Sequence, residues 1–211
     1  MSIQKRDFNK EAAAWDENPV RVKLALEIAQ AMREEARPNA ATMALDFGCG
    51  TGLVTLALQP YVGAITGVDS SEGMLGVLRA KVERAKLPNV TTRLVDVEAG
   101  GRLEGRYDLI VSSMTLHHIR NVAALLAQFH AVAAPSAVLC IADLDEEGGR
   151  FHGDNRGVFH FGFDRARLRR DFEVAGFVDV RDRTAARVTR PGADGAVREF
   201  TVMLMTGRRE G

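Results

Sequence analysis

Three glycines at alternate positions, in the segment Asp46-Phe47-Gly48-Cys49-Gly50-Thr51-Gly52, constrain the fold of this chain more than any other feature. They follow a short apolar run, Met43–Phe47, that is typical of a buried strand. Because glycine has no Cβ, a ligand can approach the backbone of such a turn closely, and the helix that follows offers free N–H groups. The pattern predicts a strand, a ligand-binding turn and a helix in that order, although a tight turn without a ligand would use the same residues.

Apolar runs and segments of helical periodicity alternate along the remainder of the chain. Strands separated by helices form βαβ units, so we expect an α/β fold with a doubly wound, seven-stranded, mostly parallel sheet of Rossmann-like layout. The final two strands are joined only by the turn-rich segment 190–195 and should pair antiparallel. The expected strands are 43–47, 64–68, 90–95, 107–112, 137–142, 177–183 and 200–206, and the expected helices after residue 40 are 51–58, 71–85, 122–132 and 164–175.

Residues 1–39 are expected to form a helical arm in front of a ligand-binding domain at 40–211. Asn18-Pro19 has the pattern of a helix start, in which a capping residue precedes proline at the first helical position. Apolar residues then recur every four positions over 20–32, as on one face of an amphipathic helix.

A carboxylate lies at the end of each of the first three expected strands: Asp46, Asp69 and Asp96. The carboxyl ends of parallel strands meet at one edge of the sheet, where such folds bind their ligands. Asp69 lies 21 positions after Gly48, about the separation at which a βαβ unit places a carboxylate on a ribose. Asp96 and Val97 suit an adenine edge, because the carboxylate can accept from the exocyclic amine while the backbone N–H meets a ring nitrogen.

Two common phosphate-binding patterns are absent from the glycine-rich segment. A dinucleotide fingerprint G-x-G-x-x-G would need a small residue where Leu53 stands, and the Gly-Lys of a P-loop does not occur. Asp46 would repel a polyphosphate and would attract a ligand with an ammonium or sulfonium charge. An NAD-dependent oxidoreductase of similar topology therefore stays only as an alternative.

Together these segments resemble the class I S-adenosylmethionine-dependent methyltransferases, in particular the small-molecule branch that includes ubiquinone and menaquinone biosynthesis enzymes. The resemblance rests on 44–52 (ALDFGCGTG), 68–75 (VDSSEGML), Asp96-Val97 and 107–119 (YDLIVSSMTLHHI). It implies S-adenosyl-L-methionine as the cofactor, a sheet order of 3-2-1-4-5-7-6 with an antiparallel last strand, and an N-terminal arm that closes over the cofactor as a lid. The cofactor-binding residues that it implies are Asp46, Gly48, Cys49, Gly50, Gly52, Asp69, Ser70, Met74, Asp96, Val97 and Ser112.

Methyl transfer is an in-line displacement at a sulfonium carbon, so the protein must align the reactants, exclude water and, where the acceptor carries a proton, supply a base. His117 and His118 are the candidate catalytic bases, because the resemblance places the transferred methyl group beside their loop and imidazole titrates near neutral pH. Either ring could instead lie in the core or cap a helix. Trp15, Met114 and His160 are the candidate residues for binding the acceptor.

The segment 143–160 is rich in acidic residues and histidine. A divalent ion is conceivable there, but a solvated acidic loop accounts for the same composition and the spacing matches no metal motif, so we expect no metal site. We expect Arg165, Arg167, Arg169 and Arg170 to form a solvated helix face.

The chain carries 28 basic and 28 acidic side chains, so it lacks the basic excess of proteins that hold nucleic acid through its phosphates. Two cysteines far apart, no secretory signal and no apolar run long enough for a membrane span predict a cytoplasmic location. We therefore expect an enzyme that methylates a small organic acceptor, at oxygen or carbon. An RNA or protein substrate and a cofactor-binding but inactive partner protein stay open, as do the acceptor's identity and the oligomeric state.

Overall fold

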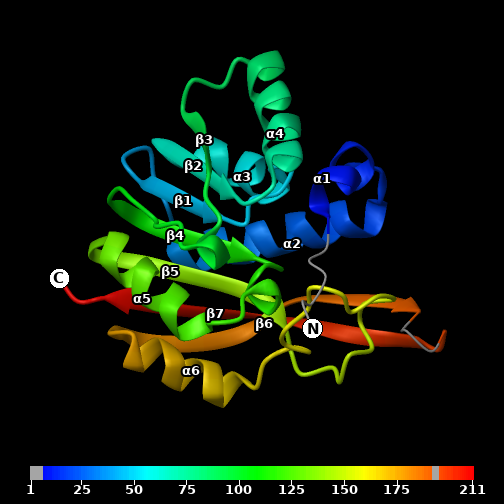
Figure 1. Ribbon diagram of the computed structural model, residues 1–211. Coiled ribbons are helices and arrows are strands. Elements are labelled where there is room, and N and C mark those ends of the chain that lie inside the picture. The colour runs from blue at the N-terminus through cyan, green and yellow to red at the C-terminus, as the bar shows by residue number, and fades with distance from the viewer. Residues whose placement is uncertain (1–6, 192–194) are drawn as a thin grey trace.

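The computed structural model describes residues 7–191 and 195–211 and contains one sheet in the order β3-β2-β1-β4-β5-β7-β6 (Figure 1). Strands β1 to β5 pair in parallel, whereas β7 runs antiparallel to both β5 and β6. The predicted strand order and the antiparallel last strand are confirmed. The strands are β1 (Met43–Phe47), β2 (Ala64–Asp69), β3 (Val90–Leu94), β4 (Tyr107–Ser113), β5 (Ala133–Leu144), β6 (Phe177–Pro191) and β7 (Val197–Arg209).

Side-chain caps mark the start of several helices. Asn18 Oδ1 accepts from the backbone N–H groups of Val20 and Arg21, and Ser71 Oγ accepts from the N–H of Met74. Each cap satisfies donors that the first turn of a helix leaves free. The helices are α1 (Phe8–Glu11), η1 (Ala12–Glu17), α2 (Pro19–Ala36), α3 (Leu53–Leu58), η2 (Gln59–Tyr61), α4 (Glu72–Ala85), η3 (Val97–Ala99), η4 (Leu116–His118), α5 (Val122–Val132) and α6 (Arg165–Val174).

Apolar side chains fill both faces of the sheet, as a parallel sheet covered by helices on two sides requires. Leu109 and Val111 of β4 pack in the same cluster as Ile28 of α2. Ile110, between them, packs on the opposite face in the cluster of Phe129 from α5. Alternate residues of the continuous apolar run in β4 thus pack in the cores on the two faces of the sheet.

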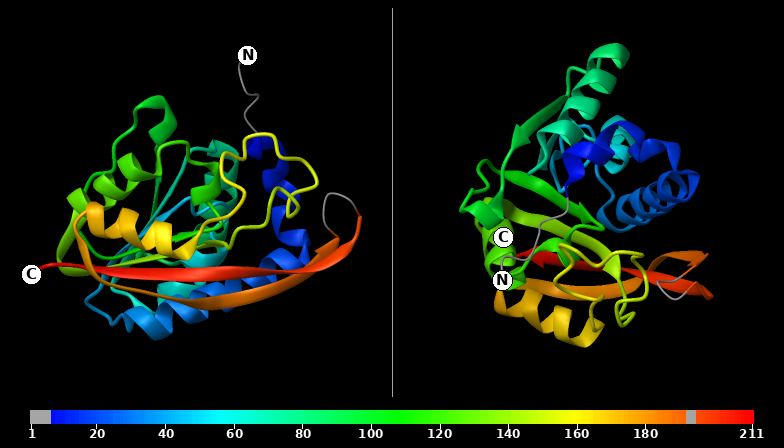
Figure 2. Two further views of the ribbon diagram at one scale, coloured as in Figure 1. Left: turned by 90° about the horizontal axis from the view of Figure 1, so that it is seen from below. Right: turned by 45° about the vertical axis from the view of Figure 1, so that its right-hand side comes forward.

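The last hairpin is longer than the sequence predicts. Pairing runs from Phe177 opposite Arg209 to Pro191 opposite Val197, so the expected loop at 190–195 is partly strand. Pro191 is tolerated because it lies at the last paired position of β6, an edge strand, where a missing N–H breaks no ladder in the sheet interior. Figure 2 shows the two strands projecting past the rest of the sheet.

The N-terminal segment contributes to two different layers. Helix α1 and η1 lie against α4, whereas α2 packs on α3 and β6 and buries Ile28 and Met32 in the domain core. The division at 39/40 into arm and domain remains a prediction. None of the helices in the described ranges combines the length and the apolar character that a bilayer crossing requires.

Candidate active site

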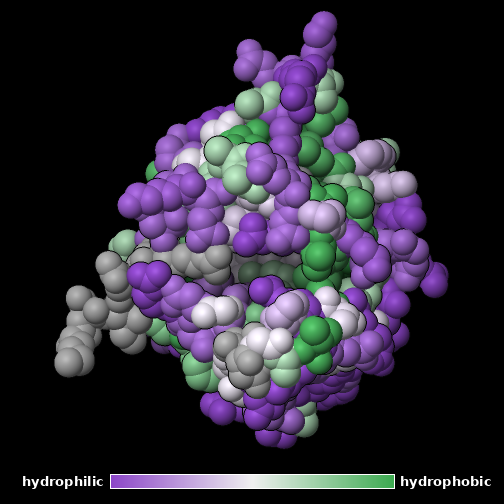
Figure 3. All heavy atoms as spheres, turned by 90° about the vertical axis from the view of Figure 1, so that its right-hand side faces the viewer, coloured by the Kyte–Doolittle hydropathy of each residue, from purple (hydrophilic) through white to green (hydrophobic). Residues whose placement is uncertain are grey.

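A cavity of about 1130 Å³ opens at the carboxyl ends of β1 to β4. Its wall includes the loops after these strands, α1 and α2, the loop between β5 and α6, and the far end of the β6–β7 hairpin. On the face shown in Figure 3 the surface is hollowed, with apolar residues (green) on the floor of the hollow and along one side. The site therefore lies where ligands bind in doubly wound folds.

Each glycine of the turn after β1 has a positive φ, but for different reasons. A Cβ on Gly48 would lie 2.2 Å from Thr115 Oγ1, and a Cβ on Gly52 would lie 2.3 Å from Leu78 Cδ1. A Cβ on Gly50 would meet nothing within 4 Å, and Gly50 lines the cavity. Packing therefore requires Gly48 and Gly52 to lack side chains, whereas Gly50 leaves open space on the ligand side.

Asp46 is buried at the end of β1 and lines the cavity. Its Oδ2 accepts from the hydroxyl of Thr55 at 2.6 Å. Burial raises the pKa of Asp46 to about 7, the Thr55 hydrogen bond lowers it again in part, and the nearby charge of Asp69 raises it. A cationic group in the cavity would favour the ionised form of this carboxyl group.

The carboxylates after β2 and β3 are oriented by backbone donors. Asp69 Oδ2 accepts from the N–H of Gly50, and its Oδ1 accepts from the N–H of Ser71, both at 2.8 Å. Asp96 caps η3 by accepting from the N–H of Glu98 at 3.0 Å. Both carboxylates line the cavity, where a ligand can contact them.

His117 and Asp143 form a buried pair at the carboxyl ends of β4 and β5. His117 Nδ1 lies 2.7 Å from Asp143 Oδ1, and the backbone N–H of His117 donates to Oδ2 at 3.2 Å. Burial raises the pKa of Asp143, but the charge and hydrogen bonds of His117 outweigh that effect, so the pKa lies below its usual value. An ionised Asp143 fixes the proton on Nδ1 and leaves Nε2 as the basic nitrogen of a ring that lines the cavity.

His118 also lines the cavity, but its ring is held differently. His118 Nδ1 lies 2.6 Å from the carbonyl oxygen of Gly157, and the ring of Phe8 meets it edge-on with centroids 5.2 Å apart. Phe8 in turn packs edge-on against Trp15 at 5.9 Å. His118 therefore contacts the N-terminal segment and the β5–α6 loop.

Two side chains attach the N-terminal segment to the ligand-binding loops. Asn9 Oδ1 accepts from the N–H of Gly73 at 2.8 Å. Asp16 accepts from the hydroxyl of Thr51 at 2.6 Å and pairs with Lys81 of α4. These contacts hold the segment over the turn after β1, as a lid would be held, although its role as a lid stays a prediction.

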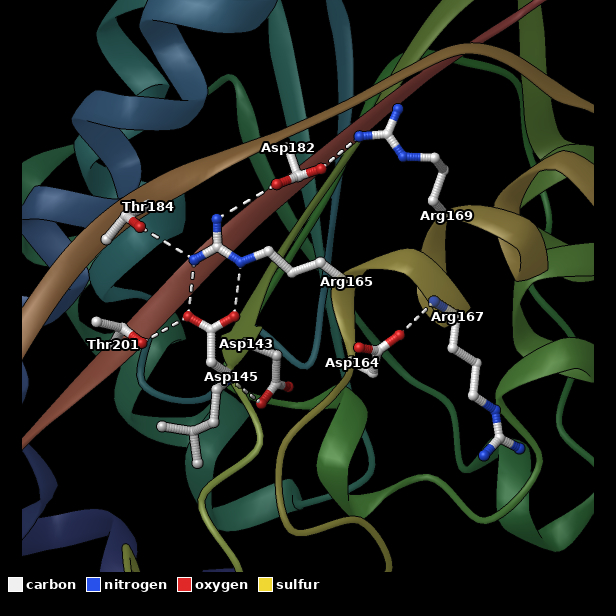
Figure 4. A network of polar contacts seen from close by, with 10 residues as sticks. Asp143, Asp145, Asp164, Arg165, Arg167, Arg169, Asp182, Thr184 and Thr201 are labelled. Atoms are coloured by element: carbon white, nitrogen blue, oxygen red, sulfur yellow. Dashed lines mark hydrogen bonds and ion pairs between the residues drawn. The ribbon is translucent and has the colours of Figure 1, made fainter.

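The β5–α6 loop, 145–163, is anchored by a network of ion pairs (Figure 4). Arg165 binds Asp145 through two N–O contacts of 2.7 Å, Thr201 donates to the same carboxylate, and Asp182 accepts from Arg165 and from Arg169. The expectation of a solvated helix face is therefore wrong for Arg165 and Arg169, which turn toward β6. The network fixes one wall of the cavity.

The acidic residues of 143–160 do not converge on one point. Asp143 binds His117, Asp145 binds Arg165, and Asp154 pairs with Arg156. Within 7–191 and 195–211, no three His, Cys, Asp or Glu side chains gather as metal ligands would.

Most of the predicted site residues meet at the cavity wall, and three do not line it. Gly52 packs on Leu78, Ser112 is buried beside its cavity-lining neighbour Ser113, and His160 Nε2 binds the carbonyl oxygen of Ile119 at 2.9 Å. The predicted residues that line the cavity are Asp46, Gly48, Cys49, Gly50, Asp69, Ser70, Met74, Asp96, Val97, Met114, His117, His118 and Trp15.

The sequence alone did not predict several residues that form the wall of the cavity or position its side chains. The sequence places Asp143 only within the acidic segment 143–160, yet the ends of adjacent parallel strands meet, and this rule pairs Asp143 with His117. Phe151, Val188 and Arg190 also line the cavity. No local pattern marks them, because they reach the cavity through the docked loop and the unexpectedly long hairpin.

Comparisons with known proteins identify the family of this chain. The family model described as "Methyltransferase domain" matches residues 20–181. An uncharacterized methyltransferase of Schizosaccharomyces pombe is 32% identical over 132 residues, which are 56% of this chain and 46% of that protein. A malonyl-(acyl-carrier protein) O-methyltransferase of Bacillus cereus is 34% identical over 127 residues, which are 59% of this chain and 45% of that protein. The matched region thus spans about half the length of these relatives.

A solved structure shows the same fold. Phosphoethanolamine N-methyltransferase 2 of Haemonchus contortus, in complex with S-adenosyl-L-methionine, superposes with a TM-score of 0.68. The match covers 87% of this chain and 52% of that one at 16% identity, so the likeness concerns the fold alone.

Proposed function

The chain belongs to the methyltransferase-domain family, and on this premise we propose that it transfers the methyl group of S-adenosylmethionine to an oxygen or carbon nucleophile of a small organic acceptor. One observation carries the proposal: a single cavity joins the glycine turn and its carboxylates to the buried His117–Asp143 pair. A cofactor site and a base beside it are the two parts that methylation of a protonated acceptor needs.

The residues present fit this cofactor. The open side of Gly50 gives room for a ligand against the backbone, and Asp46 and Asp69 provide negative charge beside it. Burial raises the pKa of the Cys49 thiol well above its usual value, with Asp46 and Asp69 adding to the effect, so Cys49 stays neutral at the site. Asp46 would face the ammonium group, Asp69 the ribose, and Asp96 with Val97 the adenine.

His117 acts as the base in this proposal. The bound cofactor supplies an electrophilic methyl carbon with a neutral leaving group, so the protein need not protonate that group. Nε2 of His117 removes the acceptor's proton, and Asp143 acts as a positioning residue that holds the ring and its tautomer. A base in reach contributes about 10²–10⁴-fold, and alignment supplies roughly 7–11 kcal/mol of the barrier reduction.

The rim of the cavity favours a small acceptor over RNA. Lys10 pairs with Asp7 at 3.4 Å, Arg120 with Glu98 at 3.5 Å, and Arg156 with Asp154. Because acidic partners neutralise these three cations, they do not form the basic stripe that phosphate-backbone binding uses.

The test is a screen of small-molecule pools and of phenol and carboxylic acid panels with methyl-labelled S-adenosylmethionine. We expect a labelled small product whose formation falls 10²–10⁴-fold in His117→Ala and less than tenfold in His118→Gln, with unchanged cofactor affinity in both. Absence of cofactor binding by calorimetry would refute the proposal at its first step. Equal activity of the His117 variant would refute the assigned base.

A further inference from the structure

The wall of the cavity divides by chemistry into two regions. One holds the glycine turn and the carboxylates that we assign to the cofactor. The other lies between the N-terminal half of α2 and the far end of the β6–β7 hairpin, and it is apolar. This second region, the α2–hairpin groove, is lined by the exposed Val20, the half-buried Arg190 and the largely buried Leu24, Phe151 and Val188.

Helix α2 and strand β6 are joined at one end of the groove. At that end, Arg183 of β6 donates to the carbonyl oxygen of Ala31 at 3.1 Å and pairs with Glu34 and Glu35 of α2 at 2.8 and 2.9 Å. Toward the tip of the hairpin, residues of the two elements line the cavity instead of bridging it.

Arg190 is a cationic residue of this groove. Its guanidinium lies over the ring of Phe151, with Cζ 4.7 Å from the ring centroid, and the side chain is half-buried. In the part of the chain that the structure describes, no acidic side chain pairs with it, whereas Arg187 on the same strand pairs with Glu199 at 2.6 Å. Arg190 thus offers a cation to whatever occupies the groove.

We propose that the α2–hairpin groove binds the methyl acceptor, and that this acceptor has an apolar body carrying one anionic group, a carboxylate, sulfonate or phosphate, held by Arg190. The nucleophile lies at the other end of the acceptor, toward His117. The inference rests on the proposed function and adds the class of acceptor. A guanidinium binds such anions through paired N–H donors, and Val20 supplies exposed apolar area that the acceptor would remove from water.

The experiment uses two fluorescent probes that differ only in charge. 1-Anilinonaphthalene-8-sulfonate has an aromatic body with one sulfonate, and N-phenyl-1-naphthylamine is its neutral analogue. Each is titrated into the protein with saturating S-adenosylhomocysteine, so that the cofactor region is filled. Calorimetry with S-adenosylhomocysteine comes first: failure to bind would count against the proposed function, not against the groove.

The variants come with matched controls. Arg190→Gln should weaken the sulfonate probe about tenfold or more and change the neutral probe less than twofold. Arg187→Gln, which alters a paired arginine of the same strand, should change neither. Val20→Asp should weaken both probes, and Leu26→Asp, at an equally exposed apolar residue of α2 outside the cavity, should weaken neither.

Cofactor-competent protein that binds the sulfonate probe no more tightly than the neutral one would overturn the proposal. So would an Arg190→Gln variant that binds both probes as the parent does. Loss of S-adenosylhomocysteine binding in Val20→Asp would indicate that the two regions are one site, and it would also contradict the assignment.

Discussion

The two halves of the cavity are built from different parts of the polypeptide. On the side of β1 to β3, the backbone shapes the site: glycines with positive φ form the turn, and N–H groups of Gly50 and Ser71 orient Asp69. On the side of β4 to β7, side chains shape it: His117 is held by Asp143, and Phe151 stacks under Arg190.

The difference explains what each half can recognise. A backbone-built surface keeps its donors whatever the neighbouring side chains are, so it suits a ligand of constant structure. A surface built from side chains changes with each substitution, so it suits the part of the site that sets specificity. We infer that binding of the cofactor and choice of acceptor can be altered separately, and the following predictions test this separation.

Among the substitutions that test this separation, the largest effect is expected at Asp143, on the side-chain half. Asp143→Asn removes the charge that fixes the proton on His117 Nδ1, and kcat should fall about 100-fold. KM for the acceptor and the affinity for S-adenosylhomocysteine should stay within threefold, as measured by steady-state kinetics and calorimetry. A parallel loss of cofactor affinity would show that the two halves are coupled.

Asp46→Asn should act on the cofactor half alone, weakening S-adenosylhomocysteine by roughly 10–100-fold through loss of a charge-assisted contact. Because the pKa of Asp46 is raised to about 7 and a cationic ligand prefers the ionised form, the parent's affinity should increase about tenfold per pH unit from pH 5.5 to 7. The variant should lack this slope. A parent affinity independent of pH in this range contradicts the assigned contact.

The same carboxyl group has an opposite effect on stability. The folded pKa of Asp46 lies above the unfolded value, so the folded state binds more protons between about pH 4 and 7 and loses stability as the pH rises through that window. Relative to Asp46→Asn, the ligand-free parent should therefore become less stable toward pH 7, by about 2–4 kcal/mol. Denaturant titrations of the parent and of Asp46→Asn at pH 5 and 8 measure this. If the two proteins differed in free energy of unfolding by the same amount at both pH values, a neutral, buried Asp46 would be contradicted.

Gly50→Ala and Gly52→Ala distinguish a glycine that leaves space for the ligand from a glycine that the packing of the turn requires. Gly50→Ala places a methyl group in the open ligand space and should weaken S-adenosylhomocysteine about tenfold, with a stability cost of roughly 1–2 kcal/mol for its left-handed φ. Gly52→Ala carries that cost and also clashes with Leu78, so it should unfold at clearly lower denaturant concentration. A reversal of this order would show that Gly50 does not face the ligand.

The smallest effect on binding is expected at Arg165. Arg165→Gln leaves Asp145 without its two contacts and should lower the free energy of unfolding by about 1–2 kcal/mol. Cofactor affinity should be unchanged, because the network lies on the side-chain half. A weakened affinity would mean that the β5–α6 loop contributes to the cofactor region.

The sequence predicted the backbone-built half far better than the side-chain half. A positive φ favours glycine, and strand-end carboxylates recur at local spacings, so the turn within residues 44–52 and the position of Asp69 at a strand end can be predicted from local patterns. His117 and Asp143 are 26 positions apart, and Val20 and Arg190 meet the same cavity only through the fold. The hairpin was predicted too short because proline and glycine suggested a loop, whereas pairing continues to Pro191.

A crystal structure with S-adenosylhomocysteine tests the account most directly. We predict adenosine against Gly50 with Asp69 on the ribose, and the sulfur atom facing the cavity region of His117, with the α2–hairpin groove still open. A nucleoside bound elsewhere, or a sulfur atom directed away from His117, would contradict the division of the site into these two halves.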